Sequence, residues 1–202
     1  AELYLTTGET EYATVLLKNS GVISKNIEKY SAVLGRVSQK LADDSFTATV
    51  TKSVKEYEAS VLAQQRENPY GVPYKPYVWG AGWDIQDFGV GQLFLSLGFP
   101  DVVTTEYAFN ALNFVLGCHP GSNRASFASG VGTESLTVAY GANRDDWSYI
   151  PGGIASGTAL IRPDFPELKT WPYLWQQAEY VMGGGAADYM LLAMAADALL
   201  NR

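Results

Sequence analysis

The chain has 202 residues, of which 47% are hydrophobic and 17% charged, and this composition is that of a folded globular protein. Its formal charge of −7 argues against a nucleic-acid binder, because such proteins present a basic face. The chain has no uncharged apolar run of about eighteen residues, and it does not open with a basic segment and an apolar core. The sequence therefore predicts neither a membrane span nor a signal peptide.

Two amphipathic helices are predicted in the first part of the chain. Apolar residues recur every three or four positions from Ile23 to Leu41, which indicates a helix of about five turns. Asp43 and the two residues after it interrupt this pattern and offer an N-cap. A second stripe with the same spacing runs from Phe46 to Val61. We expect the two helices to form an antiparallel hairpin.

A loop and two further helices are predicted next. Residues 68–76 hold three prolines and a glycine, a composition typical of a loop. Helices are predicted over Ile85–Leu97 and Val102–Leu116, and the second should be buried because it is apolar on most faces. Gly89 and Gly91 lower the helix propensity of the first, so we expect them to serve close helix packing.

The remainder of the chain combines long loops with apolar helices. Residues 117–170 are irregular, with a short strand predicted near Ser135–Tyr140. Helices are predicted over Pro172–Met182 and Ala186–Leu200, and the last should be a core helix because nearly all its residues are apolar. The sequence thus predicts an all-α chain of helical hairpins, residues 1–202 forming part of one domain, with functional loops at one end.

The stretch 113–132 (NFVLGCHPGSNRASFASGVG) is the most informative part of the chain. Gly117 suits the end of a helix and Pro120 cannot continue one, so a helix stop followed by a long ordered loop is predicted. Cys118 is the single cysteine and excludes an intrachain disulfide. His119 is the single histidine and therefore cannot belong to a histidine-rich metal site.

Four segments match, in order, the motifs of a known enzyme family: Asn68–Tyr74 (NPYGVPY), Trp79-Gly80, Phe114–Gly132 (FVLGCHPGSNRASFASGVG) and Trp175–Glu179 (WQQAE). In these segments the chain resembles the C-terminal half of the catalytic module of glycoside hydrolase family nine. That family includes endoglucanases and exo-acting glucosidases or glucosaminidases. The resemblance implies a six-hairpin α/α toroid, of which this chain would be a part.

Three departures from the family pattern lie in the sugar-contacting loops. His119 stands where the family has asparagine, and Ala178 replaces the asparagine before the acid. Residues 140–144 stand where the family has a Pro-His-His-Arg loop, and they keep only the arginine. The resemblance therefore points to hydrolysis of a β-linked glucan or a related oligosaccharide without specifying cellulose.

Glu179 matches the position of the family's general acid. Inverting hydrolysis needs two carboxyl groups across the scissile bond, and one of them must keep its proton near neutral pH. Aromatic neighbours such as Trp175 and Tyr180 favour that state, because burial among apolar groups raises a carboxyl pKa. Judged from its context alone, Glu179 would be read as a helix-surface residue, and the acid role is what the resemblance adds.

The candidate substrate contacts are aromatic, cationic and acidic side chains near these motifs. Tryptophan and tyrosine rings serve either as sugar-stacking platforms or as core, Asp146 contacts either a sugar or Arg144 in a solvated ion pair, and His119 bonds either a sugar or a backbone carbonyl. Arg144 matches the family's arginine. The substrate-binding set is Arg144, Tyr140, His119, Trp79, Trp83, Trp147 and Asp146.

The resemblance also implies features outside these residues. The family's water-activating aspartates lie in the first half of its toroid, and no segment here resembles that half, so the missing N-terminal half of the same protein is the expected partner. A polymeric sugar substrate implies an extracellular or periplasmic location. No cofactor is predicted, while a structural calcium ion in the loops is left open.

Two alternatives belong to other functional classes. The first is a helical carbohydrate-binding module that descends from such an enzyme and does not cleave its ligand. The second is a six-hairpin polysaccharide lyase, in which Tyr140, His119 and Arg144 would act on an acidic sugar. The negative net charge makes the lyase less attractive, because it disfavours an anionic substrate.

Overall fold

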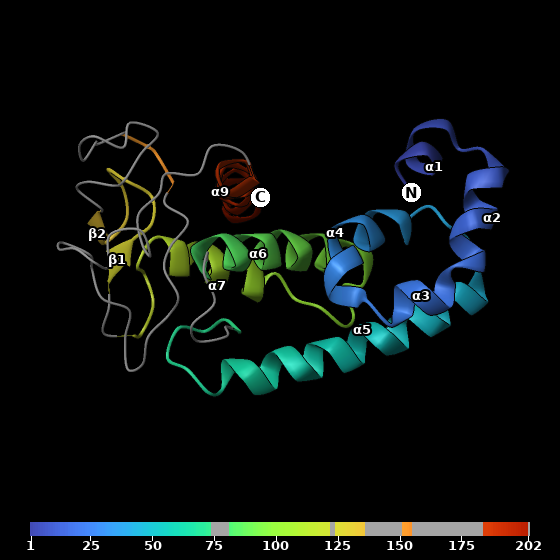
Figure 1. The fold of residues 1–202 in the computed structure, drawn as a ribbon, viewed down its shortest axis with the longest axis horizontal. Helices are drawn as coiled ribbons and strands as arrows, with labels where there is room; N and C mark the ends of the chain where they lie inside the picture. Colours follow the sequence, from blue (N-terminus) through green and yellow to red (C-terminus); the bar gives the residue numbers. More distant parts are fainter. Residues whose placement is uncertain (74–80, 122–123, 136–150, 155–183, 202) are drawn as a thin grey trace, which may run out of the picture. The chain divides into compact units, whose positions relative to one another are not determined.

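The computed structural model describes residues 1–73, 81–121, 124–135, 151–154 and 184–201. Helices take up 66% of these residues, which confirms the prediction of a mainly helical chain (Figure 1). The chain divides into two compact units. Unit 1 comprises Ala1–Ala63 with Val90–Glu106, and unit 2 comprises Gln64–Gly89 with Tyr107–Arg202.

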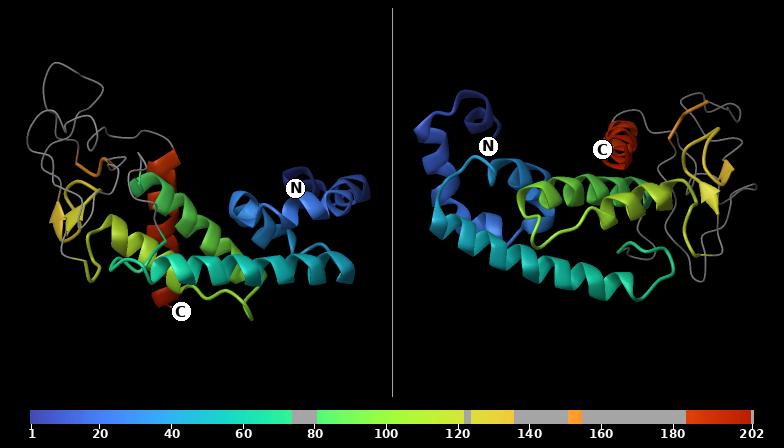
Figure 2. Two further views of the ribbon diagram at one scale, coloured as in Figure 1. Left: turned by 60° about the horizontal axis from the view of Figure 1, so that its bottom comes forward. Right: turned by 180° about the vertical axis from the view of Figure 1, so that it is seen from behind.

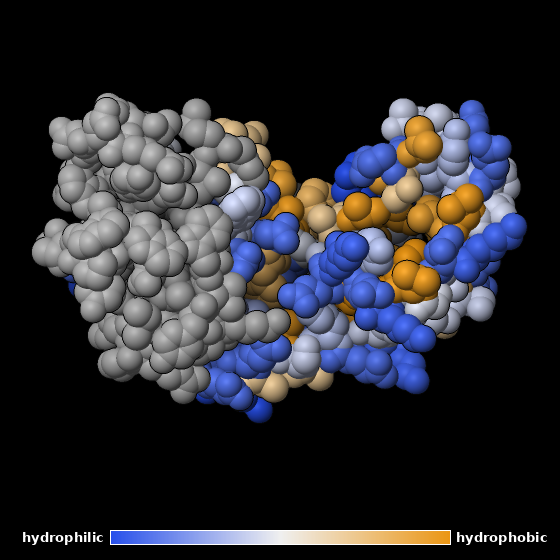
Figure 3. Space-filling view, in the orientation of Figure 1, coloured by the Kyte–Doolittle hydropathy of each residue, from blue (hydrophilic) through white to orange (hydrophobic). Residues whose placement is uncertain are grey.

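Three short helices begin unit 1, although no helix is predicted before Ile23. They are α1 (Glu2–Thr7), α2 (Thr10–Lys18) and α3 (Ser20–Ser24). Apolar surface is visible over this end of unit 1 (Figure 3), where Leu3, Val15 and Val22 are exposed. These helices are too short to be stable by themselves and depend on packing against the rest of the unit.

The helix predicted over residues 23–41 is shorter in the structure. Helix α4 spans Ile27–Val37, and Asn26 precedes it with a non-helical backbone (φ −136°, ψ 45°). The Asn26 side chain donates to the Val22 carbonyl at 2.8 Å, which ends the preceding turn. The apolar spacing hides this break, because Ile23 and Ile27 lie four positions apart on either side of it.

Helix α5 (Asp44–Gln65) confirms the second predicted helix. The Asp43 carboxylate accepts a hydrogen bond from the Phe46 amide at 2.7 Å, so the predicted N-cap is present. Its predicted apolar stripe is buried at Phe46, Val50, Val54 and Val61.

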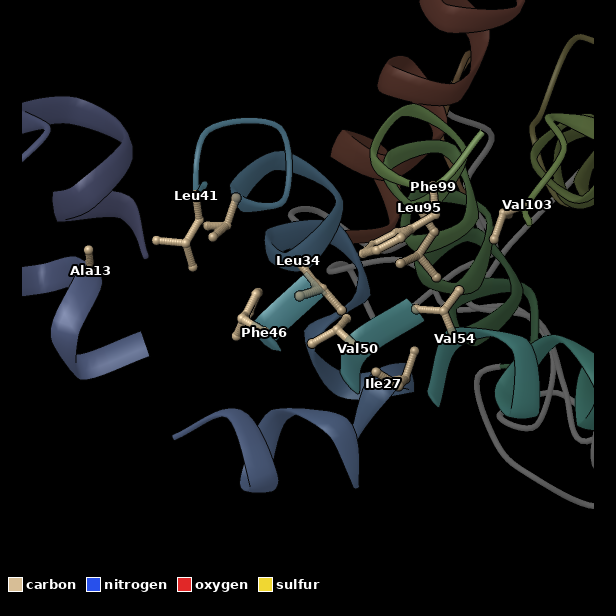
Figure 4. Close-up of a cluster of buried hydrophobic side chains, with 11 residues drawn as sticks. Ala13, Ile27, Leu34, Leu41, Phe46, Val50, Val54, Leu95, Phe99 and Val103 are labelled. Carbon is tan, nitrogen blue, oxygen red and sulfur yellow. The ribbon is translucent and has the colours of Figure 1, made fainter. Parts of the chain in front are cut away.

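The core of unit 1 combines the stripes of α4 and α5 with the second half of α6 (Ala81–Gly98) (Figure 4). Gly35 makes this packing close, because a Cβ there would overlap the Phe94 carbonyl and lie 2.8 Å from the Leu95 amide nitrogen. The buried members of this core are Ala13, Ile27, Leu34, Val37, Leu41, Phe46, Val50, Val54, Leu95, Phe99 and Val103.

The close packing predicted for the two glycines of α6 is confirmed. In unit 1 a Cβ at Gly91 would overlap the Ser31 hydroxyl. In unit 2 a Cβ at Gly89 would lie 2.5 Å from the Ala111 Cβ and 3.1 Å from a Leu192 methyl group. The first half of α6 thus lies against α7 (Glu106–Val115) and α9 (Gly184–Leu200), as the views in Figure 2 also show.

Helix α9 corrects one expectation. It was predicted to be a core helix, and Leu192 is indeed buried, with 2% of its surface exposed. Met190, Met194 and Leu200 are instead exposed at 58%, 71% and 74%. Composition shows that a helix has apolar surface, but burial also requires a neighbouring element to cover that surface.

The other predictions for the second half are tested in part. Helix α7 starts at Glu106, four residues later than predicted, and it is buried as expected at Ala111, Phe114 and Val115. Strands β1 (Ala125–Ser126) and β2 (Glu134–Ser135) pair in parallel, and the strand predicted over 135–140 therefore begins within β2. Its remainder and the helix predicted over 172–182 lie outside the described residues.

Candidate functional site

The candidate site of unit 2 begins at the C-terminal end of α7. Gly117 has a φ of 69°, a left-handed conformation that glycine adopts without strain. The Cys118 amide donates to the Asn113 carbonyl at 2.7 Å, and the Gly117 amide donates to the Phe114 carbonyl at 3.1 Å. This pattern is a Schellman cap, so the predicted helix stop at Gly117 is confirmed.

The loop that follows returns to the end of the same helix. The Phe127 amide donates to the Val115 carbonyl and the Thr133 amide to the Leu116 carbonyl, both at 2.8 Å. The Thr133 hydroxyl donates to the Gly117 carbonyl at 3.1 Å. These bonds satisfy carbonyls that a helix end leaves open, so residues 126–133 are fixed against α7.

Two fully buried serines hold this loop in place, and one of them, Ser129, joins it to residues 151–154. The Ser126 hydroxyl donates to the Ala128 carbonyl at 2.9 Å, which stabilises the local turn. The Ser129 amide donates to the Gly153 carbonyl, and the Gly152 amide returns a bond to the Ser129 carbonyl, both at 2.9 Å. Two loop segments are therefore held together by backbone hydrogen bonds.

A second turn meets the loop after α7 at His119. The Tyr70 ring is buried and lies edge-on to the His119 imidazole, with 4.7 Å between the ring centroids and 87° between the planes. The Asn110 side chain donates to the Gly71 carbonyl at 3.0 Å and ties this turn to α7. The NPYGVPY and LGCHPG motifs, distant in the sequence, are thus in direct contact where the structure describes them.

The first turns of α6 and α9 also converge in unit 2. A Cβ at Gly185 would lie 3.9 Å from the Trp83 ring and 3.9 Å from an Ile154 methyl group. One turn further along the helices, partial burial and then the negative charge of Asp87 raise the pKa of the Asp188 carboxyl above its ordinary value. The start of α9 is therefore packed beside a partly exposed tryptophan and two interacting carboxyl groups.

The structure describes two of the eight predicted site residues. Trp83 lies at the start of α6, and His119 lies in the loop after α7, where its Nδ1 accepts a hydrogen bond from the Gly121 amide at 3.1 Å. The structure thus shows a bond from a backbone amide to the His119 ring, and the two roles considered for this residue stay predictions. The remaining candidates lie outside the described residues: Glu179, Arg144, Tyr140, Trp79, Trp147 and Asp146.

Two residues of this site were not predicted from the sequence. Tyr70 was assigned only to a loop, and its contact with His119 joins residues far apart in the chain, which no local pattern reveals. Asp188 stands out in the sequence as one of two charged residues in a largely apolar helix, and that signal could have identified it. Tyr70 lies in the NPYGVPY motif, in which the resemblance assigns no site residue, and Asp188 lies outside the four motifs.

The described part of the chain contains neither a candidate metal site nor a candidate membrane helix. Within those residues no group of three or more histidine, cysteine, aspartate or glutamate side chains is arranged to hold a metal ion. No described helix combines the length and the apolar character that crossing a bilayer requires.

No protein-family model matches this chain, and a comparison with curated proteins gives no match either.

Proposed function

We propose that this chain is the C-terminal part of the catalytic domain of a glycoside hydrolase with an α/α toroid fold. Its substrate would be a β-linked glucan or a related oligosaccharide, and hydrolysis would invert the anomeric configuration. The proposal rests on the resemblance of most of residues 68–200 to family nine, and on one observation about how two of its motifs pack.

That observation is the convergence in unit 2 of the two motif segments that the structure describes in large part. The turn at Asn68–Val72 contacts the loop at Gly117–Gly121 through the ring pair of Tyr70 and His119. The segment Ser126–Gly132 lies against the end of α7 and binds residues 151–154. Two motifs, distant in the sequence, that form one loop assembly on a helical scaffold support a functional site, because rigid helices commonly position such loops.

The general acid in this proposal is Glu179. It lies five residues before Gly184, the first residue of α9, and α9 starts beside Trp83. Glu179 would protonate the leaving oxygen, and an aspartate outside the 202 residues would activate the attacking water from the opposite face of the sugar. In inverting enzymes these two carboxyl groups lie about 6.5–9.5 Å apart, which leaves room for the water.

Trp83 is the proposed stacking platform among the described residues, because it is partly exposed at the end of the helices where the loops gather. Sugar rings present apolar C–H faces that an aromatic ring covers. Arg144, Tyr140, Trp79, Trp147 and Asp146 remain proposed substrate contacts. The extracellular or periplasmic location and a structural calcium ion in the loops belong to the same proposal.

The decisive variant is Glu179→Gln in the natural polypeptide that contains these residues. It keeps the size of the side chain and removes the proton donor, so turnover of cellohexaose should fall about a thousandfold. Glu134→Gln is the matched control, since it removes one exposed carboxylate from β2 and should leave turnover unchanged. Circular dichroism of both variants should match that of the unmodified protein.

If the Glu179→Gln variant keeps its turnover, Glu179 is not the general acid. Cellohexaose binding without cleavage, in unmodified protein that contains the aspartate-bearing segment, would favour the carbohydrate-binding module instead. Binding is measured by titration calorimetry and cleavage by chromatography of the products.

A further inference from the structure

Two X-Pro turns of the same kind face each other in unit 2. In the first, the Asn68 side-chain oxygen accepts a hydrogen bond from the Tyr70 amide at 2.9 Å across Pro69. In the second, the His119 Nδ1 accepts one from the Gly121 amide at 3.1 Å across Pro120. Oδ1 of asparagine and Nδ1 of histidine are both bonded to Cγ, so the imidazole performs the turn-forming role of an amide.

The His119 ring also fills the space between the turns. It lies edge-on to Tyr70 and stacks on Phe114, with 5.7 Å between the centroids of the latter pair and 25° between their planes. Gly121 completes the fit, because a Cβ there would overlap the Tyr70 ring edge and lie 3.0 Å from the His119 Nδ1. The two turns therefore pack against each other without room for an additional methyl group.

The hydrogen bond at Nδ1 also determines the tautomer of His119. Because Nδ1 accepts the Gly121 proton, the ring proton lies on Nε2. Nε2 has essentially no solvent-accessible surface, so neither ring nitrogen faces the solvent for a sugar hydroxyl to reach. Both polar atoms of the imidazole are thus directed into the protein.

We propose that His119 is a positioning residue that fixes the turn at 119–121 against the turn at 68–71, and so sets the place of the loop after α7. It acts through the Gly121 amide and the Tyr70 ring and does not contact the substrate. We call these contacts of His119 with the Gly121 amide and the Tyr70 ring the clamp. This inference deepens the proposed function and rests on it for the effect on sugar binding, but the contacts of the clamp do not depend on that function.

Three variants of the natural polypeptide that contains these residues test the clamp. His119→Asn keeps an acceptor for the Gly121 amide, His119→Phe keeps a ring but removes the acceptor, and Asp43→Ala is the control. Asp43→Ala removes a side-chain acceptor of the same type from the Phe46 amide in unit 1. Exchange of the Gly121 amide with solvent is followed by NMR, and cellohexaose affinity by titration calorimetry.

The clamp predicts rescue by asparagine. The Gly121 amide should exchange about tenfold faster in His119→Phe, since its hydrogen bond is lost, and within about twofold of the unmodified rate in His119→Asn. Affinity for cellohexaose should follow the same order, with a loss of about tenfold in His119→Phe and recovery in His119→Asn. Asp43→Ala should change neither quantity.

Two results would overturn the proposal. An unchanged exchange rate of the Gly121 amide in His119→Phe would show that the imidazole does not fix the turn at 119–121. Loss of affinity in His119→Asn with Gly121 still protected would show that the imidazole contacts the sugar itself. If the unmodified natural polypeptide binds no cellohexaose, the proposed function loses its support, and the Gly121 exchange rates alone decide whether the clamp stands.

Discussion

The two units of this chain are held together in different ways. Unit 1 is a set of helices around an apolar core, and Gly35 packs directly against the backbone of α6. The described loops of unit 2 are held instead by caps, turns and rings, with Tyr70, His119 and Phe114 at their centre. Apolar stripes on helices hold unit 1 together, whereas residues that form caps and turns hold the described loops of unit 2.

This difference explains where function is expected. A core of interlocked apolar side chains provides stability but presents no polar groups for chemistry. Loops held by specific hydrogen bonds keep polar and aromatic residues at the surface of a rigid scaffold. The comparison therefore assigns the proposed sugar site to unit 2.

The largest effect on stability is expected at the close contact in unit 1. Gly35→Ala should reduce the free energy of unfolding by about 3 kcal/mol, because its Cβ would collide with the backbone of α6, which cannot move as a side chain does. Gly21→Ala is the control, because a Cβ there meets nothing within 4 Å and alanine favours a helix. Urea unfolding followed by circular dichroism measures both variants, and equal midpoints would contradict the packing described.

A smaller effect is expected at Glu58, which accepts a hydrogen bond from the Gln92 side chain at 2.8 Å. Burial raises the pKa of the Glu58 carboxyl, and the bond from Gln92 opposes that rise. The protonated form is therefore favoured by folding. Protonated Glu58 therefore stabilises the folded chain most at a pH below 4.5, the ordinary pKa of a glutamate carboxyl. This stabilisation is lost as the pH rises through the higher pKa of Glu58 in the folded state.

Glu58→Gln should remove this pH dependence. The Gln92 Oε1 atom is buried, with no hydrogen-bond partner among the described residues, and an amide at position 58 offers it a donor. Unfolding at pH 7 should then cost about 1 kcal/mol more than in the unmodified chain, with the difference vanishing near pH 4. Glu56→Gln, which removes an exposed charge from the same helix, should show no such pH-dependent difference.

The smallest effect is expected in unit 2, at Asp87 and Asp188. Since the charge of Asp87 contributes to the raised pKa of Asp188, Asp87→Asn should lower that pKa, as measured by carbon NMR of the carboxyl group. Asp188→Asn should stabilise the chain at pH 7 by about 0.5 kcal/mol, and by less in the Asp87→Asn background. Equal effects of Asp188→Asn in both backgrounds would show that the two carboxyl groups do not interact.

The sequence predicts these two units unequally. Helix α5 and its cap at Asp43 follow from local spacing, and so does most of α6. The break at Asn26 does not, since the apolar repeat continues across it. The stop at Gly117 follows from its turn chemistry, whereas the contact of Tyr70 with His119 depends on tertiary packing that no local pattern encodes.

The most direct test of the proposed function is proton NMR of the products as the natural polypeptide containing these residues acts on cellohexaose. An inverting enzyme releases the α-anomer first, and mutarotation then produces the β-anomer. The account predicts early accumulation of the α-anomer, and its absence when Glu179 is replaced by glutamine. Early accumulation of the β-anomer, or no cleavage at all, would contradict it.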